Sequence, residues 1–146
     1  MKIAIGYDPN AMEFKAVLAP FIKDLGHEVV GYGGDDPIYP NVAFAVAEDV
    51  VSGKCDRGIL ICGTGIGMSI AANKVRGAYA ALVTNVYQAR RAVLSNNANI
   101  ITMGSQVTGV ELAKCLTEEY LSLSFVRNER SSLKVDRITE YEREGG

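Results

Sequence analysis

The stretch Ile59-Leu60-Ile61-Cys62-Gly63-Thr64-Gly65-Ile66-Gly67-Met68-Ser69 runs from an apolar segment through a cysteine and three alternating glycines into a helix-like segment. This order predicts a buried strand that delivers a thiol to a glycine-rich turn at the start of a helix. The start of a helix presents unpaired N–H groups and a partial positive charge. Because both stabilise negative charge, we expect a base or nucleophile here beside an anion-binding turn.

Strand-like and helix-like segments alternate on both sides of this stretch. The expected strands span residues 2–7, 27–32, 57–62, 77–83 and 99–103, and the expected helices span 11–25, 42–51, 68–74, 86–94, 110–121 and about 133–144. Such alternation is typical of βαβ units and a mostly parallel sheet. We therefore predict one α/β domain over residues 1–146, a Rossmann-like (flavodoxin-like) doubly wound fold with a five-stranded parallel sheet in three αβα layers.

Polar groups follow or flank several of the expected strands. In doubly wound folds, ligands bind at the carboxyl ends of the strands. Asp8, Cys62-Gly63-Thr64 and Asn96-Asn97 are all expected at or near that edge. The predicted fold therefore brings these groups toward one ligand site.

Composition narrows the classes of function. The net charge of −2 and the pI near 5.4 disfavour a nucleic-acid surface. No window reaches the length of a membrane span, and the first residues enter a strand without a signal-peptide pattern. Three scattered cysteines fit a reducing cytoplasm. The only histidine, His27, excludes a multi-histidine metal site within one chain.

Several candidate residues have both a chemical and a structural interpretation. Met68 occupies the last glycine position of a dinucleotide fingerprint, and no Gly-Lys-Ser or Gly-Lys-Thr is present, so nucleotide binding is disfavoured. Cys62 is either reactive or a buried structural thiol. Asp8 is either an active-site carboxylate or an N-cap of the following helix.

The amide-rich turn and the charged C-terminal segment also have two interpretations each. Asn96 either caps a neighbouring element or binds a sugar hydroxyl. Arg130 and Lys134 are four residues apart, so on a helix they share a face that suits a phosphate, and a solvated helix face is the alternative. The terminal helix either lies on its own chain or reaches across to a second subunit.

Together these residues resemble the type B ribose-5-phosphate isomerases and the related galactose-6-phosphate isomerase subunits. Residues 59–75 are similar to the signature of that family almost letter for letter. Further matches are residues 1–6 with Asp8, Gly26-His27-Glu28-Val29, Tyr39-Pro40, Asn96 and Arg130. The resemblance implies interconversion of an aldose and a ketose phosphate through a cis-enediolate, without a metal or an organic cofactor. It also implies a homodimer or homotetramer with interface active sites and a C-terminal helix that packs on the partner.

The resemblance implies a role for each candidate by position. Cys62 is the base that moves a proton between C1 and C2. Thr64 and the amides of Gly63, Gly65 and Gly67 hold the enediolate oxygen. Asp8 contacts the reacting hydroxyls, Asn96 holds a sugar oxygen from the neighbouring subunit, and Arg130 binds the phosphate with Lys134, which stands where the family usually has a second arginine.

Two positions depart from the family pattern. Pro9 stands where the family usually has a histidine that helps to bind phosphate. Ser95 stands where a second histidine usually opens the sugar ring, and a hydroxyl does not titrate near neutral pH. Either the chain is a weak or degenerate ribose-5-phosphate isomerase, or its substrate needs no ring opening.

A tetrose 4-phosphate is a substrate of the second kind, because its esterified O4 cannot close a furanose ring. Residues 94–98 and 100–104 also resemble the branch assigned to erythrulose-4-phosphate isomerisation, and in part a galactose-6-phosphate isomerase subunit. We therefore favour erythrose or erythrulose 4-phosphate ahead of ribose 5-phosphate. The alternative from another class is a non-catalytic sugar-phosphate-binding subunit of a hetero-oligomeric isomerase such as galactose-6-phosphate isomerase.

Overall fold

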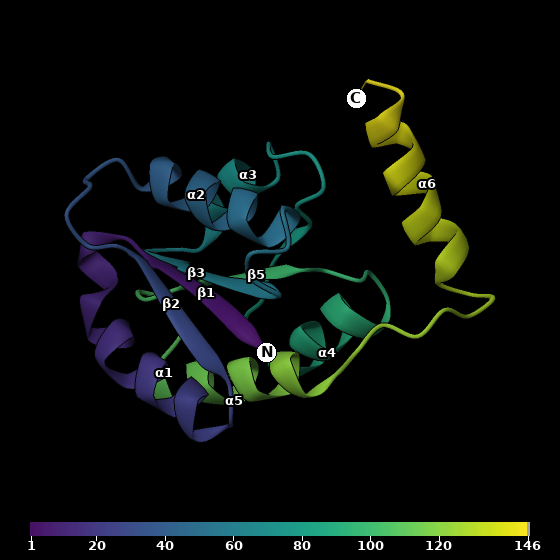
Figure 1. Ribbon diagram of the computed structural model, residues 1–146. Coiled ribbons are helices and arrows are strands. Elements are labelled where there is room, and N and C mark those ends of the chain that lie inside the picture. The colour runs from purple at the N-terminus through teal and green to yellow at the C-terminus, as the bar shows by residue number, and fades with distance from the viewer. Residues whose placement is uncertain (146) are drawn as a thin grey trace.

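The computed structural model describes residues 1–145, which form a five-stranded sheet flanked by helices (Figure 1). The strands are β1 (Lys2–Tyr7), β2 (Glu28–Gly33), β3 (Arg57–Cys62), β4 (Ala80–Leu82) and β5 (Ile100–Gly104). The helices are α1 (Met12–Asp24), α2 (Tyr39–Val51), α3 (Ile66–Ala72), α4 (Val86–Leu94), α5 (Val110–Ser122) and α6 (Ser132–Arg143), and a 3-10 turn (Pro9–Ala11) precedes α1. All strand pairs are parallel, in the order β2-β1-β3-β5-β4. The predicted α/β fold is confirmed.

Helices cover both faces of the sheet (Figure 1). α1, α4 and α5 pack on one face, where Leu18 and Tyr120 are fully buried. α2 and α3 pack on the other face, where Met68 is fully buried. Successive strand residues point to opposite faces, so Ile5 joins the first cluster and Ala4 the second. Burial on both faces explains why the central strands read as continuous apolar runs rather than alternating ones.

Three elements differ from the sequence-based expectation by more than one residue at a boundary. β4 has three residues instead of seven, and just before it the amide of Tyr79 donates to the side chain of Asn99 (Oδ1, 2.8 Å). α2 begins at Tyr39 within the expected loop, since Pro40 is readily accommodated in a first helical turn. α3 begins at Ile66, two residues earlier than expected.

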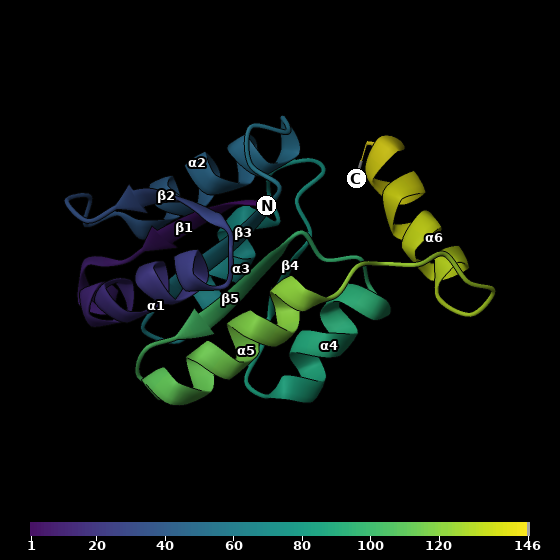
Figure 2. The ribbon, with the colours of Figure 1, turned by 60° about the horizontal axis from the view of Figure 1, so that its bottom comes forward.

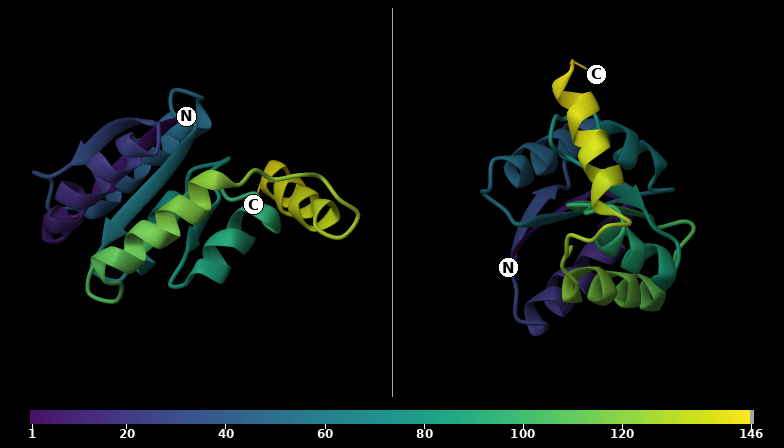
Figure 3. Two further views of the ribbon diagram at one scale, coloured as in Figure 1. Left: turned by 90° about the horizontal axis from the view of Figure 1, so that it is seen from below. Right: turned by 90° about the vertical axis from the view of Figure 1, so that its right-hand side faces the viewer.

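α6 projects beyond the layered body of the chain (Figures 1 and 2). The segment 123–131 leads out to it, as both views of Figure 3 show. Arg57 fixes the start of this segment, because its guanidinium donates to the carbonyls of Tyr120 and Leu123. The helix expected at about 133–144 is present as α6, Ser132–Arg143.

The position of Asn96-Asn97 corrects one expectation. Cys62 pairs with Gly104 at the carboxyl ends of β3 and β5, whereas Gly58 pairs with Ile100 at their amino ends. Asn96-Asn97 precedes Ile100, so it lies at the amino edge, across the sheet from Cys62. The expectation of a common carboxyl edge is wrong for this turn, because it comes before its strand and not after it.

Candidate functional site

Cys62 ends β3 with its side chain almost fully buried, at 4% exposure. Its Sγ accepts a hydrogen bond from the amide of Gly65 at 3.1 Å. Gly65 adopts φ +81°, a conformation that favours glycine, and a Cβ there would lie 2.6 Å from Leu82 and 2.8 Å from the backbone of Met103. The turn therefore needs glycine at this position in order to aim an N–H at the sulfur.

The neighbouring strand β5 braces the loop of residues 62–67. The Thr102 hydroxyl donates to the carbonyl of Gly65 at 2.8 Å. The amides of Ser105 and Gln106 donate to the carbonyls of Cys62 and Gly63 at 2.8 and 2.9 Å. These bonds fix the loop from one side, which is the rigidity that a preorganised polar site requires.

The other donors of the loop remain available for a ligand. Within residues 1–145, the amides of Gly63 and Gly67 have no hydrogen-bond acceptor. The hydroxyl of Thr64 accepts a hydrogen bond from the amide of Ile66 at 3.2 Å, and this residue is exposed. Because α3 is only seven residues long, the individual amides, more than the dipole of the helix, determine how an anion is held.

Asp8 lies next to Cys62 at the carboxyl edge. Its amide donates to the carbonyl of Ile61 at 2.9 Å, which ties it to the end of β3. Its Oδ1 accepts from the amide of Asn10 at 2.8 Å, so Asp8 caps the 3-10 turn that begins at Pro9. Asp8 is thus an N-cap, but of this turn and not of α1, whose N-cap is Ala11, and the bond uses only one of the two carboxylate oxygens.

Two side chains beside the loop were not among the predicted site residues. The hydroxyl of Tyr39 lies directly over Gly67, where it would overlap any Cβ. The side-chain amide of Gln106 lies 3.4 Å from the place where a Gly63 Cβ would stand. The motif Tyr39-Pro40 carried a signal for the first, whereas nothing in the sequence pattern pointed to Gln106.

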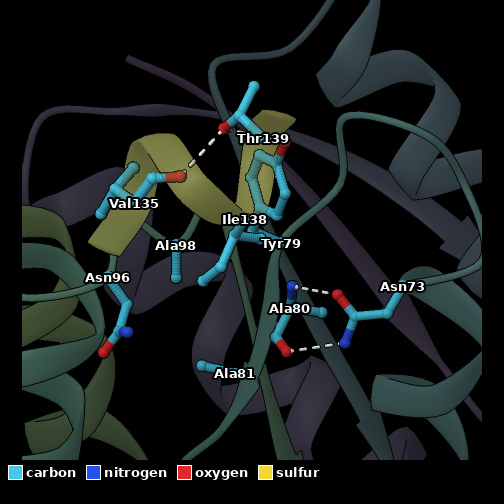
Figure 4. Close-up of a pocket in the computed structure, with 9 residues that line it drawn as sticks. All are labelled: Asn73, Tyr79, Ala80, Ala81, Asn96, Ala98, Val135, Ile138 and Thr139. Carbon is cyan, nitrogen blue, oxygen red and sulfur yellow. Dashed lines mark hydrogen bonds between the residues drawn. The ribbon is translucent and has the colours of Figure 1, made fainter. Parts of the chain in front are cut away.

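The remaining candidates lie at the amino edge and on α6. Asn96 lines a cavity of about 320 Å³ between β4 and α6 (Figure 4). The Ser95 hydroxyl accepts a hydrogen bond from Arg91 Nε at 2.7 Å. Arg130, just before α6, and Lys134, in its first turn, are both exposed. A single chain therefore brings Asp8, Cys62 and the glycine loop together, but not with these residues.

The loop that carries Arg130 has a defined conformation. The side-chain oxygen of Asn128 accepts from the amides of Arg130 and Ser131 at 3.0 and 2.8 Å. The hydroxyl of Ser132 accepts from the amide of Asn128 at 2.8 Å. These bonds fix the backbone at the start of α6 and leave the side chains of Arg130 and Lys134 in solvent.

The part of the chain that the structure describes offers neither a metal-binding cluster nor a membrane-spanning helix. No group of three or more His, Cys, Asp or Glu residues there is arranged to hold a metal ion. None of the helices described is both long and apolar enough to cross a membrane.

Comparison with known proteins identifies the relatives of this chain. The model of the Ribose/Galactose Isomerase family matches residues 3–138. D-erythrulose-4-phosphate isomerase 2 of Mycolicibacterium smegmatis is 46% identical over 97% of both chains, and D-erythrulose-4-phosphate isomerase of Pectobacterium atrosepticum is 43% identical over 97% of this chain and 95% of its own. The structure of Clostridium thermocellum ribose-5-phosphate isomerase B superposes with a TM-score of 0.92, with 42% identity and complete coverage of both chains.

Proposed function

The chain belongs to the ribose/galactose isomerase family and is a sugar-phosphate aldose–ketose isomerase, and we propose that its substrate is a short open-chain sugar phosphate. A tetrose 4-phosphate, erythrose or erythrulose 4-phosphate, fits best. The observation that supports this choice is Ser95, which stands where a ring-opening histidine is expected and whose hydroxyl is bonded to Arg91.

Ring opening needs a group that exchanges protons near neutral pH, and this chain offers none at the expected positions. The Ser95 hydroxyl does not titrate there, and Pro9 has no titratable side chain. The single histidine, His27, lies 3.0 Å from the amino group of Met1 at the amino end of β1. Desolvation, the N-terminal charge and Arg57 lower the pKa of His27. A substrate that cannot form a furanose ring needs no such group.

In the proposed reaction, Cys62 acts as a thiolate base. It removes the proton from C2 of the aldose, and the C1 carbonyl becomes the oxyanion of a cis-enediolate. The same sulfur returns the proton to C1, while the hydroxyl proton passes from O2 to O1, so the ketose forms with no net gain or loss of atoms. The Gly65 amide donates to Sγ at 3.1 Å and so holds the sulfur at the start of the glycine loop.

We assign the enediolate oxygen to the other donors of the loop. The amides of Gly63 and Gly67 and the hydroxyl of Thr64 are the groups left for it, because the Gly65 amide already serves the sulfur. Loss of one such donor typically costs about 3–4 kcal/mol of transition-state stabilisation. Asp8 has one carboxylate oxygen free for the reacting hydroxyls.

A complete site requires a second copy of the chain in this proposal. Asn96, Arg130 and Lys134 lie away from the carboxyl edge of their own sheet, so we assign them to the partner's Cys62 site. Apolar side chains on α3, beside the glycine loop, and on α6, beside the cations, remain exposed in one chain. Ile66 and Ile70 on α3 are 52% and 59% exposed, and Leu133 on α6 is 75% exposed. A homodimer or homotetramer covers such surface and places two cations, Arg130 and Lys134, on the phosphate.

A substrate panel on the purified protein tests the choice of sugar. Initial rates are measured with erythrose 4-phosphate, erythrulose 4-phosphate and ribose 5-phosphate under one set of conditions. We expect kcat/KM to be highest for the four-carbon pair. A higher kcat/KM for ribose 5-phosphate would refute the short substrate, and no turnover of any sugar phosphate would favour a non-catalytic subunit.

Replacement of Cys62 by serine tests the base. We expect turnover to fall by about 10²–10⁴-fold or more, because a serine hydroxyl is far less acidic than a thiol. Binding of a non-reacting phosphate ester, measured by calorimetry, should persist. Cys115→Ser is the matched control, since Cys115 is an exposed thiol on α5. Retained turnover in Cys62→Ser would reject Cys62 as the base.

A further inference from the structure

A few hydrogen bonds attach α6 to the layered body of the chain. Among residues 1–145, the hydrogen bonds from α6 to the body all lead to Gly77 and Tyr79. Glu142 Oε1 accepts from the amide of Gly77 at 2.8 Å, and Glu142 Oε2 accepts from the hydroxyl of Tyr79 at 2.7 Å. Thr139 adds a longer contact of 3.5 Å to the same hydroxyl. One carboxylate thus makes both of the short bonds.

Packing does little to set the angle of α6. The cavity of about 320 Å³ separates α6 from β4, and its floor is made of small side chains, Ala80, Ala81 and Ala98 (Figure 4). Ile138, which lines this cavity, remains 51% exposed. Because few apolar contacts within its own chain hold the helix, the directional bonds of Glu142 fix the position of α6 against the body of that chain.

The receiving turn is itself fixed to the sheet. The side chain of Asn99, next to β5, donates to the carbonyl of Gly77 at 2.9 Å and accepts from the amide of Tyr79 at 2.8 Å. Glu142 therefore accepts hydrogen bonds from two donors on a turn that is itself fixed to the sheet. Desolvation raises the pKa of Glu142, but the bonds from Tyr79 and Gly77 and the charge of Arg76 outweigh it and leave the pKa lowered.

Glu142 and the two cations lie toward opposite ends of α6, so a small tilt of the helix at Glu142 moves the cations appreciably. Lys134 lies eight residues before Glu142 on α6, which is about 12 Å along the helix axis at 1.5 Å per residue. A tilt of about 5° at the Glu142 end moves Lys134 by about 1 Å over that length, and a displacement of this size is enough to weaken a positioned contact substantially.

We propose that Glu142 is a positioning residue: through Gly77 and Tyr79 it sets the angle of α6 at which Arg130 and Lys134 bind the substrate phosphate in the partner subunit's site. This proposal rests on the proposed function. It separates Glu142 from the catalytic residues, because Glu142 touches neither the substrate nor the reacting atoms.

Three variants test the proposal in the full-length protein. Glu142→Ala removes both bonds, Tyr79→Phe removes one of them, and Glu142→Gln retains an acceptor oxygen. Glu140→Ala is the matched control, because Glu140 is an exposed carboxylate on the same helix whose partner is Arg137. KM and kcat are measured for the best sugar phosphate, the oligomeric state by sedimentation at the assay concentration, and Gly77 amide exchange by NMR.

We expect Glu142→Ala to raise KM about tenfold, with kcat within about twofold of wild type, the oligomer intact and Gly77 exchange accelerated. Tyr79→Phe should raise KM less, Glu142→Gln should recover part of the loss, and Glu140→Ala should match wild type. An unchanged KM in Glu142→Ala, or a loss of activity explained by dissociation into monomers, overturns the positioning role. An inactive wild-type protein would instead refute the proposed function, so the two failures are distinguishable.

Discussion

Gly104 offers the most stringent test of the rigidity of the loop, because it has no side chain to contact a substrate and yet packs against the loop backbone. It ends β5 directly beside the backbone of Thr64. A Cβ added at Gly104 would lie 2.5–2.6 Å from the Cα, C and O atoms of Thr64. These are backbone atoms, so no rotamer change can relieve the overlap.

The size of the effect follows from that geometry. Ordinary van der Waals contact begins at 3.4 Å, so the Thr64 backbone must move away by about 0.9 Å in Gly104→Ala. A displacement of about 1 Å in a positioned site lowers the rate by about 100-fold. Overpacking of this kind also costs about 1–3 kcal/mol of unfolding free energy.

The assay is steady-state isomerisation with the best sugar phosphate, together with urea denaturation. Gly104→Ala should lose about 100-fold in kcat while the protein remains folded at 25 °C. Gly31→Ala on β2 is the matched control, because nothing lies within 4 Å of its added methyl group. Wild-type kcat and KM in Gly104→Ala would show that the placement of Thr64 does not matter, and would refute the reasoning.

Two further predictions concern buried hydroxyls. Thr102→Val removes the hydrogen bond to the carbonyl of Gly65 at a fully buried position, so we expect a loss of about 1–3 kcal/mol in urea denaturation and a lower kcat; unchanged stability would contradict the brace. Tyr7→Phe removes a buried hydroxyl that has no partner among residues 1–145, so we expect an equal or higher Tm by calorimetry, and a clear fall would contradict that assignment.

The sequence predicted the elements of this fold well where the hydrophobic pattern is unambiguous. β1, β3 and α4 have the expected bounds, because both faces of the central strands are buried and the helix has a clear polar face. β4 was overestimated, since its alanine-rich run does not reveal that Asn99 bonds to the backbone at Gly77 and Tyr79. Such long-range side-chain bonds leave no periodic signal in the sequence.

The candidate site was predictable only in part, for a related reason. The glycine loop after Cys62 is local in sequence, so its motif predicted both the thiol and the turn. Asn96 was assigned to the wrong edge: in a parallel sheet a turn that comes before its strand lies at the amino edge, so the expected order of helix, turn and strand already placed it away from Cys62. Gln106 approaches Gly63 through tertiary structure alone.

The division of the loop amides has a consequence for how this site would evolve toward other sugars. The Gly65 amide bonds to Cys62 Sγ, and Thr102 and Ser105 brace the loop through its carbonyls. In our proposal, proton transfer therefore depends on groups from β3, the turn between β3 and α3, β5 and the residue that follows β5. Phosphate binding, in our proposal, depends instead on a helix held by one carboxylate on a separate element. On this proposal we expect a change in the length of the sugar to require adjustment of α6 and of the Ser95-Asn96 turn, while the proposed proton-transfer loop remains as it is.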